Sequence, residues 1–428
     1  MTDTLSIDQK SGTKKAAPTN VLRIRNFRML WIGEGISLLG DQFYLIALPW
    51  LVLLLTGNAL AVGTVFAMAG VPRALFMLVG GALTDHFTPR KLMIGSNLAR
   101  MILTGLLAGL VLTNLIQLWM LYVSALLFGL ADAFFFPAQS SIVPQLVAKD
   151  QLQTGNAIIQ GTAILSLFLG PLLAGVMISW LDASTTHSTL GIAFAFVLDS
   201  FSFLASITML NLMRIENTNA YIEKNESGVL ASIREGLLYV WNDATLKIVF
   251  PIVMGLNLLI NGPFAVGIPV LARTRFPEGA VAFGLIMSVF GGGALLGTVL
   301  AGVLPKPSKL LGTISLSIIS LMGIGLAVIG FAPTAYIAAT AALGMGIANG
   351  YANVMLITWL QQKIAPEMTG RIMSLVMFAA IGLNPVSTAL AGALIGLNAT
   401  VLLVCAGISM TLFTLLAAFN PTVRAGMD

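Results

Sequence analysis

Charged residues are scarce in this chain of 428 residues, because Asp, Glu, Lys and Arg together make up only 9% of it. Soluble domains carry about 25% charged residues, and intrinsically disordered chains are also rich in charge. The scarcity therefore excludes an ordinary soluble enzyme and a disordered protein. The 22 Lys and Arg residues are scattered along the chain, which excludes a nucleic-acid-binding protein as well.

Cysteine and histidine are almost missing. Cys405 is the single cysteine, so the chain forms neither an internal disulfide nor a thiolate metal cage. The two histidines, His86 and His187, lie in unrelated segments, and no cluster of histidines and carboxylates suggests a metal site. The sequence also lacks the glycine-rich phosphate loop of ATP-driven pumps. We expect no metal, no cofactor and no nucleotide-driven activity.

Long apolar runs, in contrast, are abundant. Hydrophobic residues make up 57% of the chain and the mean hydropathy is +0.94. A helix that crosses the bilayer needs about 20 mostly apolar residues, and the runs predict an all-α polytopic membrane protein with twelve spans. The first six expected spans are 29–55, 59–84, 92–112, 116–144, 152–180 and 188–212. The second six are 246–272, 280–304, 308–331, 334–362, 369–396 and 399–420.

The polar stretches divide this chain into five parts. Residues 1–20 are predicted to be a disordered tail, residues 21–213 and 246–420 two helical bundles, and residues 421–428 a second tail. The linker, 214–245, contains apolar residues at helical spacing, which predicts an amphipathic helix lying in the membrane interface. These apolar residues are Leu230, Ile233, Leu237, Leu238 and Trp241.

The positions of Lys and Arg predict the orientation in the membrane, because cytoplasmic loops carry an excess of both. Arg273 and Arg275 lie on one side of the expected topology, Arg73 and Arg100 fall inside spans, and the remaining basic residues lie on the other side. This bias places both termini and the linker in the cytoplasm.

The two halves of the chain look duplicated. Gly129, Gln145 and Gly175 in the first half correspond to Gly346, Gln362 and Gly392 in the second, always at the same separation of about half the chain. Such repeats predict two six-helix bundles with a ligand site between them near the middle of the membrane. This arrangement favours an alternating-access carrier over a channel.

Several segments resemble the major facilitator superfamily, and in particular its branch of macrolide-efflux proteins and the enterobactin exporter. The resemblance implies twelve helices in two pseudo-symmetric bundles, secondary transport without enzymatic activity, a monomer, and the bacterial inner membrane. The segments that carry it are Leu22 to Trp31, Ser37 to Asp41, Pro72-Arg73, Phe135 to Ala138, Pro144, and Arg234 to Gly236 with Tyr239.

A second resemblance lies between the second and third spans. Gly81, Asp85, Arg90 and Lys91 are similar to the superfamily's cytoplasmic loop motif. In the family the aspartate meets the N-terminus of the eleventh helix, here near 369–371, where unpaired N–H groups favour an anion. The resemblance therefore implies a gate at Asp85. The sequence departs from the usual motif at His86, Thr88 and Pro89.

The fifth span carries small residues and a proline. Gly161, Gly170, Pro171 and Gly175 resemble a motif of family exporters. Glycine allows a neighbouring helix to approach closely, and Pro171 removes one hydrogen bond and bends the span. In the family this pattern is associated with antiport, which favours export over uptake.

Only four acidic residues, Glu34, Asp41, Asp132 and Asp199, fall inside expected spans. A charge at the centre of the bilayer costs about 2.5–3.5 kcal/mol on insertion scales, so each needs a partner, water or a function. We predict that Asp41 binds and releases the coupled proton, that Glu34 passes it toward the cytoplasm, and that Asp132 and Asp199 are further protonation sites. The alternative is a structural ion pair with one of the intramembrane cations, Arg73 and Arg100.

Aromatic and amide side chains on the first, fourth, seventh and tenth spans are the expected lining of a substrate cavity. Asn257 and Asn261 are four residues apart on one helix face, and an amide that faces lipid would be costly. The predicted lining residues are Phe43, Tyr44, Phe135, Asn257, Asn261, Asn349 and Asn353.

Together these features predict a proton-coupled antiporter that exports drug-like or amphipathic small molecules, with the lipid bilayer and protons as its other partners. One alternative is a dedicated exporter of a single metabolite, siderophore or lysophospholipid. The other is a membrane-embedded enzyme or complex subunit, for which the sequence offers no catalytic constellation.

Overall fold

The computed structural model of the protein describes residues 21–83, 88–148, 151–183, 189–214, 229–243, 245–304, 311–364, 372, 375–376, 379, 382–396 and 398–418. Within these ranges the regular elements are helices. The first half contains η1 (Val21–Arg23), α1 (Arg25–Thr56), α2 (Ala59–Leu83), α3 (Pro89–Leu112), α4 (Leu118–Leu146), α5 (Leu152–Ala183) and α6 (Leu190–Leu212). The linker helix is α7 (Val229–Asn242). The second half contains α8 (Leu246–Thr274), α9 (Ala280–Val303), α10 (Leu311–Phe331), α11 (Ala335–Lys363), α13 (Asn384–Ile395) and α14 (Ala399–Ala418).

The predicted all-α membrane fold is confirmed. Ten helices in the described part of the chain are long and apolar enough to cross a membrane. The expected number of twelve is not confirmed, because the predicted spans 308–331 and 369–396 lie partly outside the described residues. The predicted tails, 1–20 and 421–428, also lie outside them.

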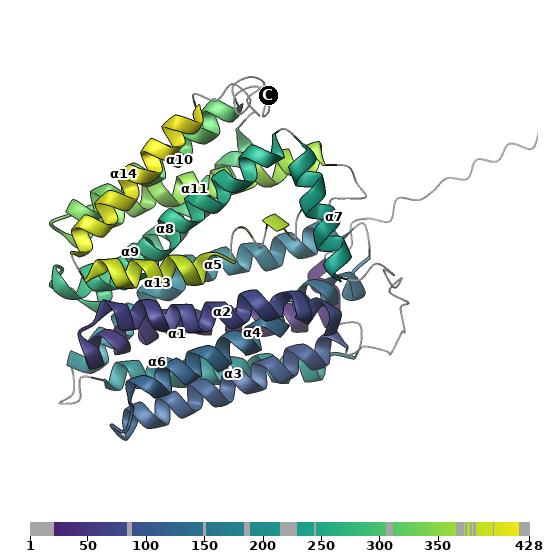
Figure 1. The fold of residues 1–428 in the computed structure, drawn as a ribbon. Coiled ribbons are helices and arrows are strands. Elements are labelled where there is room, and N and C mark those ends of the chain that lie inside the picture. The colour runs from purple at the N-terminus through teal and green to yellow at the C-terminus, as the bar shows by residue number, and fades with distance from the viewer. Residues whose placement is uncertain are drawn as a thin grey trace, which may run out of the picture.

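The helices form two bundles that lie side by side (Figure 1). In the first half α1 packs on α6 and α2 packs on α4, while in the second half α9 packs on α11 and α10 on α14. The spans run from one end of the molecule to the other, with α8, α10 and α14 inclined to α1 and α2, and α7 crosses the end where α6 ends and α8 begins. We call this end the α7 side and the other end the opposite side.

The duplication predicted from the sequence is visible in the packing of equivalent helices. The helices α4 and α11 both contain 29 residues. A Cβ atom on Gly129 would lie 1.9 Å from the carbonyl oxygen of Ala69 in α2, and one on Gly346 would lie 2.1 Å from that of Phe290 in α9. Each glycine therefore allows the same close helix crossing in its own half.

The two halves meet through a second pair of equivalent crossings. A Cβ atom on Gly175 of α5 would lie 2.4 Å from the carbonyl oxygen of Ala280 and 3.3 Å from Cα of Gly284 in α9. A Cβ atom on Gly392 of α13 would lie 2.9 Å from Cα of Gly63 in α2. All of these residues lie toward the opposite side, so the backbones of the two halves are in close contact there.

The three glycines of the predicted motif in the fifth span have different surroundings. A Cβ atom on Gly170 would lie 2.5 Å from the side chain of Gln42 in α1, and Gly175 faces α9. A Cβ atom on Gly161 would meet nothing within 4 Å. Its place in α5 borders open space rather than a neighbouring helix.

This difference yields a matched pair of variants. Gly175→Val places a branched side chain against the main chain of α9, which cannot move aside as a flexible side chain can. We expect a loss of about 1–3 kcal/mol in the free energy of unfolding from overpacking. Gly161→Val should leave this free energy unchanged. Thermal unfolding of the two variants in detergent checks this, and equal behaviour would contradict the assigned crossing.

Candidate functional site

An ion-pair cluster lies inside the first bundle, with Asp132 of α4 at its centre. One carboxylate oxygen of Asp132 pairs with the guanidinium of Arg73 from α2. The other lies 3.0 Å from Nη1 of Arg100 from α3. Asp132 is almost completely buried, and both of its oxygens are engaged. Arg73 and Arg100, the predicted intramembrane cations, are therefore the partners of Asp132. This arrangement corresponds to the structural ion pair that was the alternative interpretation of the sequence.

Arg100 is enclosed by aromatic rings and by a second polar partner. Its guanidinium carbon lies 4.3 Å from the ring centre of Phe135 and 4.6 Å from that of Phe203. One guanidinium nitrogen donates a hydrogen bond to the side-chain oxygen of Asn97. The side chain is only 3% exposed. Cation–π contacts at a desolvated site of this kind contribute about 2 kcal/mol, so the packing of α4 and α6 fixes this arginine in place.

Asp41 of α1 lies at the edge of the cluster. One of its oxygens is 3.9 Å from Nη1 of Arg100, which is close enough for attraction but too long for a hydrogen bond. That oxygen has no hydrogen-bond partner in the described part of the chain, and the side chain is 31% exposed. Asp41 is therefore held loosely and can be reached from outside the bundle, whereas Asp132 is held by two cations.

Asp199 of α6 lies behind Asp41 and is sealed from solvent. Neither of its carboxylate oxygens has a hydrogen-bond partner among the described residues, and the residue is completely buried. The hydroxyl of Ser202 donates instead to the main-chain carbonyl of Asp199, at 2.7 Å. A Cβ atom on Gly40 would lie 3.0 Å from Oδ1 of Asp199, so a glycine beside Asp41 lets this carboxylate approach α1.

Glu34 lies on α1 seven residues before Asp41, toward the α7 side. Its carboxylate accepts a hydrogen bond from the side-chain amide of Gln139 in α4, and its other oxygen has no partner. Because seven residues make about two turns, Glu34 and Asp41 lie on the same face of α1. Asp199, Asp41 and Glu34 thus form a row of acids that leads from the ion-pair cluster toward the α7 side.

The predicted cavity residues fall into two groups. In the first bundle, Tyr44 stacks on Phe128 with ring centres 4.4 Å apart, and Tyr44 and Phe135 are buried in the conformation described. In the second bundle, Asn261 donates to the side-chain oxygen of Asn384 in α13, at 2.6 Å. The remaining predicted residues are placed as follows: Asn257 accepts from Asn261 at 3.1 Å, Phe43 and Asn349 are half-buried, and Asn353 is exposed.

Three polar residues of these networks were missed in the sequence, namely Asn97, Gln139 and Asn384. Each is an amide inside or at the start of an apolar helix, and an unsatisfied amide in hydrocarbon is costly. That cost was the available signal. Gln139 and Asn384 bond predicted site residues from other helices, and Asn97 accepts from Arg100 three residues along its own helix.

The motif near the α7 side is only partly described. Asp85 and residues 369–371 lie outside the described residues, and Gly81 is placed in α2. Arg90, the second residue of α3, donates to the main-chain carbonyl of Asn211 near the end of α6, at 2.9 Å. Lys91 is exposed. A cation at a helix C-terminus is favourable, so Arg90 joins α3 to α6.

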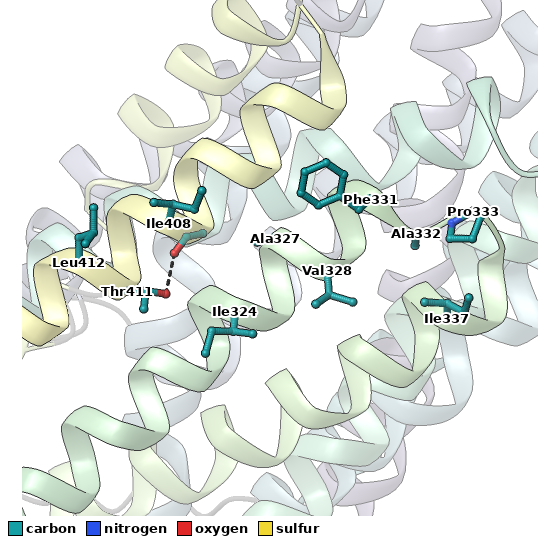
Figure 2. Close-up of a pocket in the computed structure, with 11 residues that line it drawn as sticks. Ile324, Ala327, Val328, Phe331, Ala332, Pro333, Ile337, Ile408, Thr411 and Leu412 are labelled. Carbon is teal, nitrogen blue, oxygen red and sulfur yellow. Dashed lines mark hydrogen bonds between the residues drawn. The ribbon is translucent and has the colours of Figure 1, made fainter.

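An apolar groove with a volume of about 480 Å³ lies between α10, α11 and α14 (Figure 2). The hydroxyl of Thr411 donates within its own helix to the carbonyl of Gly407, so the groove offers no free polar group. Phe331, Ile408 and Leu412 on its walls are half exposed or more. The groove therefore belongs to the outer surface of the second bundle and lies apart from the ion-pair cluster.

Two related helical bundles, a row of intramembrane acids and an amide network between helices define a polytopic carrier of small molecules. The Major Facilitator Superfamily model matches residues 30–383, and the chain belongs to this superfamily. It is a multi-pass membrane transporter and not an enzyme.

Two relatives cover nearly the whole chain. Macrolide efflux protein A of Streptococcus pyogenes is 25% identical over 382 residues, which are 87% of this chain and 90% of that protein. Multidrug efflux pump Tap of Mycolicibacterium fortuitum is 27% identical over 400 residues, which are 90% and 93% of the two chains.

Solved structures share the fold at lower sequence identity. The nucleoside transporter NupG has a TM-score of 0.70 at 13% identity and covers 94% of this chain and 98% of that chain. A bacterial homologue of the iron transporter ferroportin, in an inward-facing state, has a TM-score of 0.67 at 16% identity and covers 94% and 100%.

Proposed function

We propose that this protein exports drug-like or amphipathic small molecules in exchange for protons. Relatives that span about nine tenths of the chain are a macrolide efflux protein and a multidrug efflux pump, and they support export. The buried acids support proton coupling, because a carboxylate inside a membrane protein can bind and release a proton as its surroundings change.

The charge balance of the cluster is the observation that carries the coupling proposal. Asp41, Asp132 and Asp199 supply three carboxylates, whereas Arg73 and Arg100 supply two guanidiniums. Fully ionised, this group of five would hold one uncompensated negative charge in a low-dielectric interior, where such a charge is expensive. The cluster is therefore neutral with one resident proton, and its most loosely held acid can take up a second proton in competition with a cationic substrate.

The surroundings of each acid assign it a different role. Asp132, which two guanidiniums hold, is the fixed counter-ion of the cluster. Asp199, which is sealed and has no hydrogen-bond partner among the described residues, carries a resident proton. Asp41 is loosely held and partly exposed, and it exchanges its proton with the transported compound. Glu34 relays the proton between Asp41 and the α7 side.

The pair of glycine crossings between the halves supports alternating access. In the conformation described, α5 meets α9 and α2 meets α13 toward the opposite side. Transport requires these contacts to open while the α7 side closes, and the Asp85 motif acts as the latch on that side. The cavity residues and the amides of α8 face the substrate during this cycle.

We further propose that the protein works as a monomer in the bacterial inner membrane, with both termini and α7 in the cytoplasm. The bias of Lys and Arg in the sequence supports this orientation. Protease digestion of intact cells and of inverted vesicles would distinguish it from the reverse orientation.

Transport into inverted membrane vesicles tests the proposal. A labelled macrolide or lipophilic cation should accumulate when a proton gradient is imposed, and collapsing the gradient with an ionophore should stop accumulation. Vesicles without the protein are the control. Accumulation that persists with a sodium gradient alone would show that protons do not drive the exchange.

A further inference from the structure

The linker helix α7 is fixed to the second bundle. Val240 is buried in a cluster with Leu246 of α8 and Leu360 of α11. Asp243, which follows α7, accepts hydrogen bonds from the main-chain N–H groups of Thr245 and Leu246 and lies 3.5 Å from Nζ of Lys363. Although partial burial acts to raise the pKa of Asp243, these hydrogen bonds and Lys363 outweigh it, and the pKa is lowered. The C-terminal end of α7 thus moves with the second bundle.

A different face of α7 is left uncovered. Leu237, Leu238 and Trp241 are 53%, 50% and 66% exposed. Residues three and four apart share a helix face, so these side chains form one continuous apolar surface. The helix has 14 residues, too few to cross a bilayer. It lies crosswise to the spans at the end of the molecule (Figure 1), where the surface of the membrane would be.

Positive charge flanks this apolar surface. Arg234 is exposed and lies three and four residues before Leu237 and Leu238, on the same face. Nζ of Lys247 lies 4.7 Å from the ring centre of Trp241. The nearby acids point elsewhere: Asp243 is engaged with Lys363, and Glu235 is displaced from the centre of the apolar face by about a third of a turn.

We propose that this face of α7 binds the surface of an anionic lipid leaflet. Leu237, Leu238 and Trp241 enter the boundary between headgroups and acyl chains, and Arg234 and Lys247 contact lipid phosphates. Aromatic and cationic residues combined on a short amphipathic helix favour this position. Because α7 is fixed to the second bundle, anionic lipid restrains that bundle at the α7 side and acts as a ligand of the transporter.

The size of the effect follows from the two cations. A Lys or Arg near an anionic leaflet contributes about a fivefold factor in binding. Removing one cation should therefore lower the affinity of this face for an anionic leaflet about fivefold, and removing both should lower it further. The proposal does not depend on the transported substrate or on proton coupling, so its test needs no transport assay.

A depth-sensitive fluorophore on α7 provides the test. Cys405, which is exposed, is first replaced by alanine, and Leu238→Cys then gives a single attachment site for a bimane label. The full-length protein is reconstituted into phosphatidylcholine vesicles with increasing phosphatidylglycerol and a trace of lipid spin-labelled near the headgroup. We expect quenching to rise with phosphatidylglycerol. Arg234→Gln combined with Lys247→Gln should shift this rise to higher phosphatidylglycerol contents.

The matched control is the double variant Arg28→Gln and Arg214→Gln, which removes two exposed cations from the α7 side but not from α7. Its quenching should rise over the same range of phosphatidylglycerol contents as that of the unaltered chain. An unquenched label in every lipid would place α7 in water or against another protein. Equal quenching with and without phosphatidylglycerol would mean apolar insertion alone. An equal shift in the control would mean general surface charge. Each of these three results overturns the proposal.

Discussion

Asp132→Asn is expected to lower the free energy of unfolding by about 3 kcal/mol, the lower end of the range for breaking a buried ion pair. The carboxylate holds Arg73 and Arg100 at once, and an amide cannot neutralise either. Arg100 would remain as a buried cation whose nearest acid, Asp41, lies 3.9 Å away. The lower end applies because Arg73 is 37% exposed and water compensates part of its loss. Thermal unfolding of the purified protein in detergent measures the effect.

A milder acid replacement and a double variant make this prediction specific. Asp182→Asn alters a carboxylate that accepts one backbone hydrogen bond, from Gly191, and should cost about 1 kcal/mol or less. Adding Arg100→Gln to Asp132→Asn removes the stranded charge, so the double variant should be more stable than the sum of the single losses predicts, by at least about 1 kcal/mol. Strict additivity would show that Asp132 and Arg100 are not coupled.

Asp41→Asn is expected to abolish gradient-driven transport while the protein still folds and still binds an uncharged substrate. An amide binds no proton at working pH, so the exchange that we assign to Asp41 cannot occur. We expect at least about a hundredfold loss of gradient-driven uptake, as for removal of a proton-transferring group in catalysis. Uptake into inverted vesicles and equilibrium binding of the labelled substrate measure the two properties separately.

Two further variants test the assignment of Asp41. Glu278→Gln, which alters an exposed acid on the opposite side, should transport normally. Asp199→Asn should keep the stability of the unaltered protein, because an amide resembles the protonated acid that we propose there. Asp132→Asn should lower the stability. If Asp41→Asn couples transport to the proton gradient as the unaltered protein does, Asp41 has no part in the exchange.

The positions of the spans could be predicted because the signal is local. The apolar run at 116–144 became α4 at Leu118–Leu146, and the run at 334–362 became α11 at Ala335–Lys363. Backbone groups in hydrocarbon must bond within their own helix, so an apolar run of this length has one stable structure. The duplication was equally readable, since Gly129 and Gly346 make the same crossing in each half.

The residues of the candidate site could be identified from the sequence, but their contacts with one another could not. An ionisable residue inside an apolar run is visible at once, and every acid and arginine in the cluster was found in that way. Which arginine pairs with which acid depends on the rotation and depth of four helices that are distant in the chain. For the same reason Gln139 was missed, because its importance comes from Glu34 of another helix. Asn97 and Arg100 are three residues apart in α3, so this contact could have been read from helical spacing.

The sequence by itself determined that this protein is an all-helical, duplicated membrane carrier with few intramembrane charges. Apolar runs and small-residue motifs are local patterns, so both can be read without knowing how the helices pack. Only the tertiary structure decided that Asp132 is bound by two cations, that Asp41 is loosely held and that Asp199 has no partner. The physical reason is that the energy of a charge inside a membrane depends on what lies within a few ångströms of it. Those neighbours come from other helices.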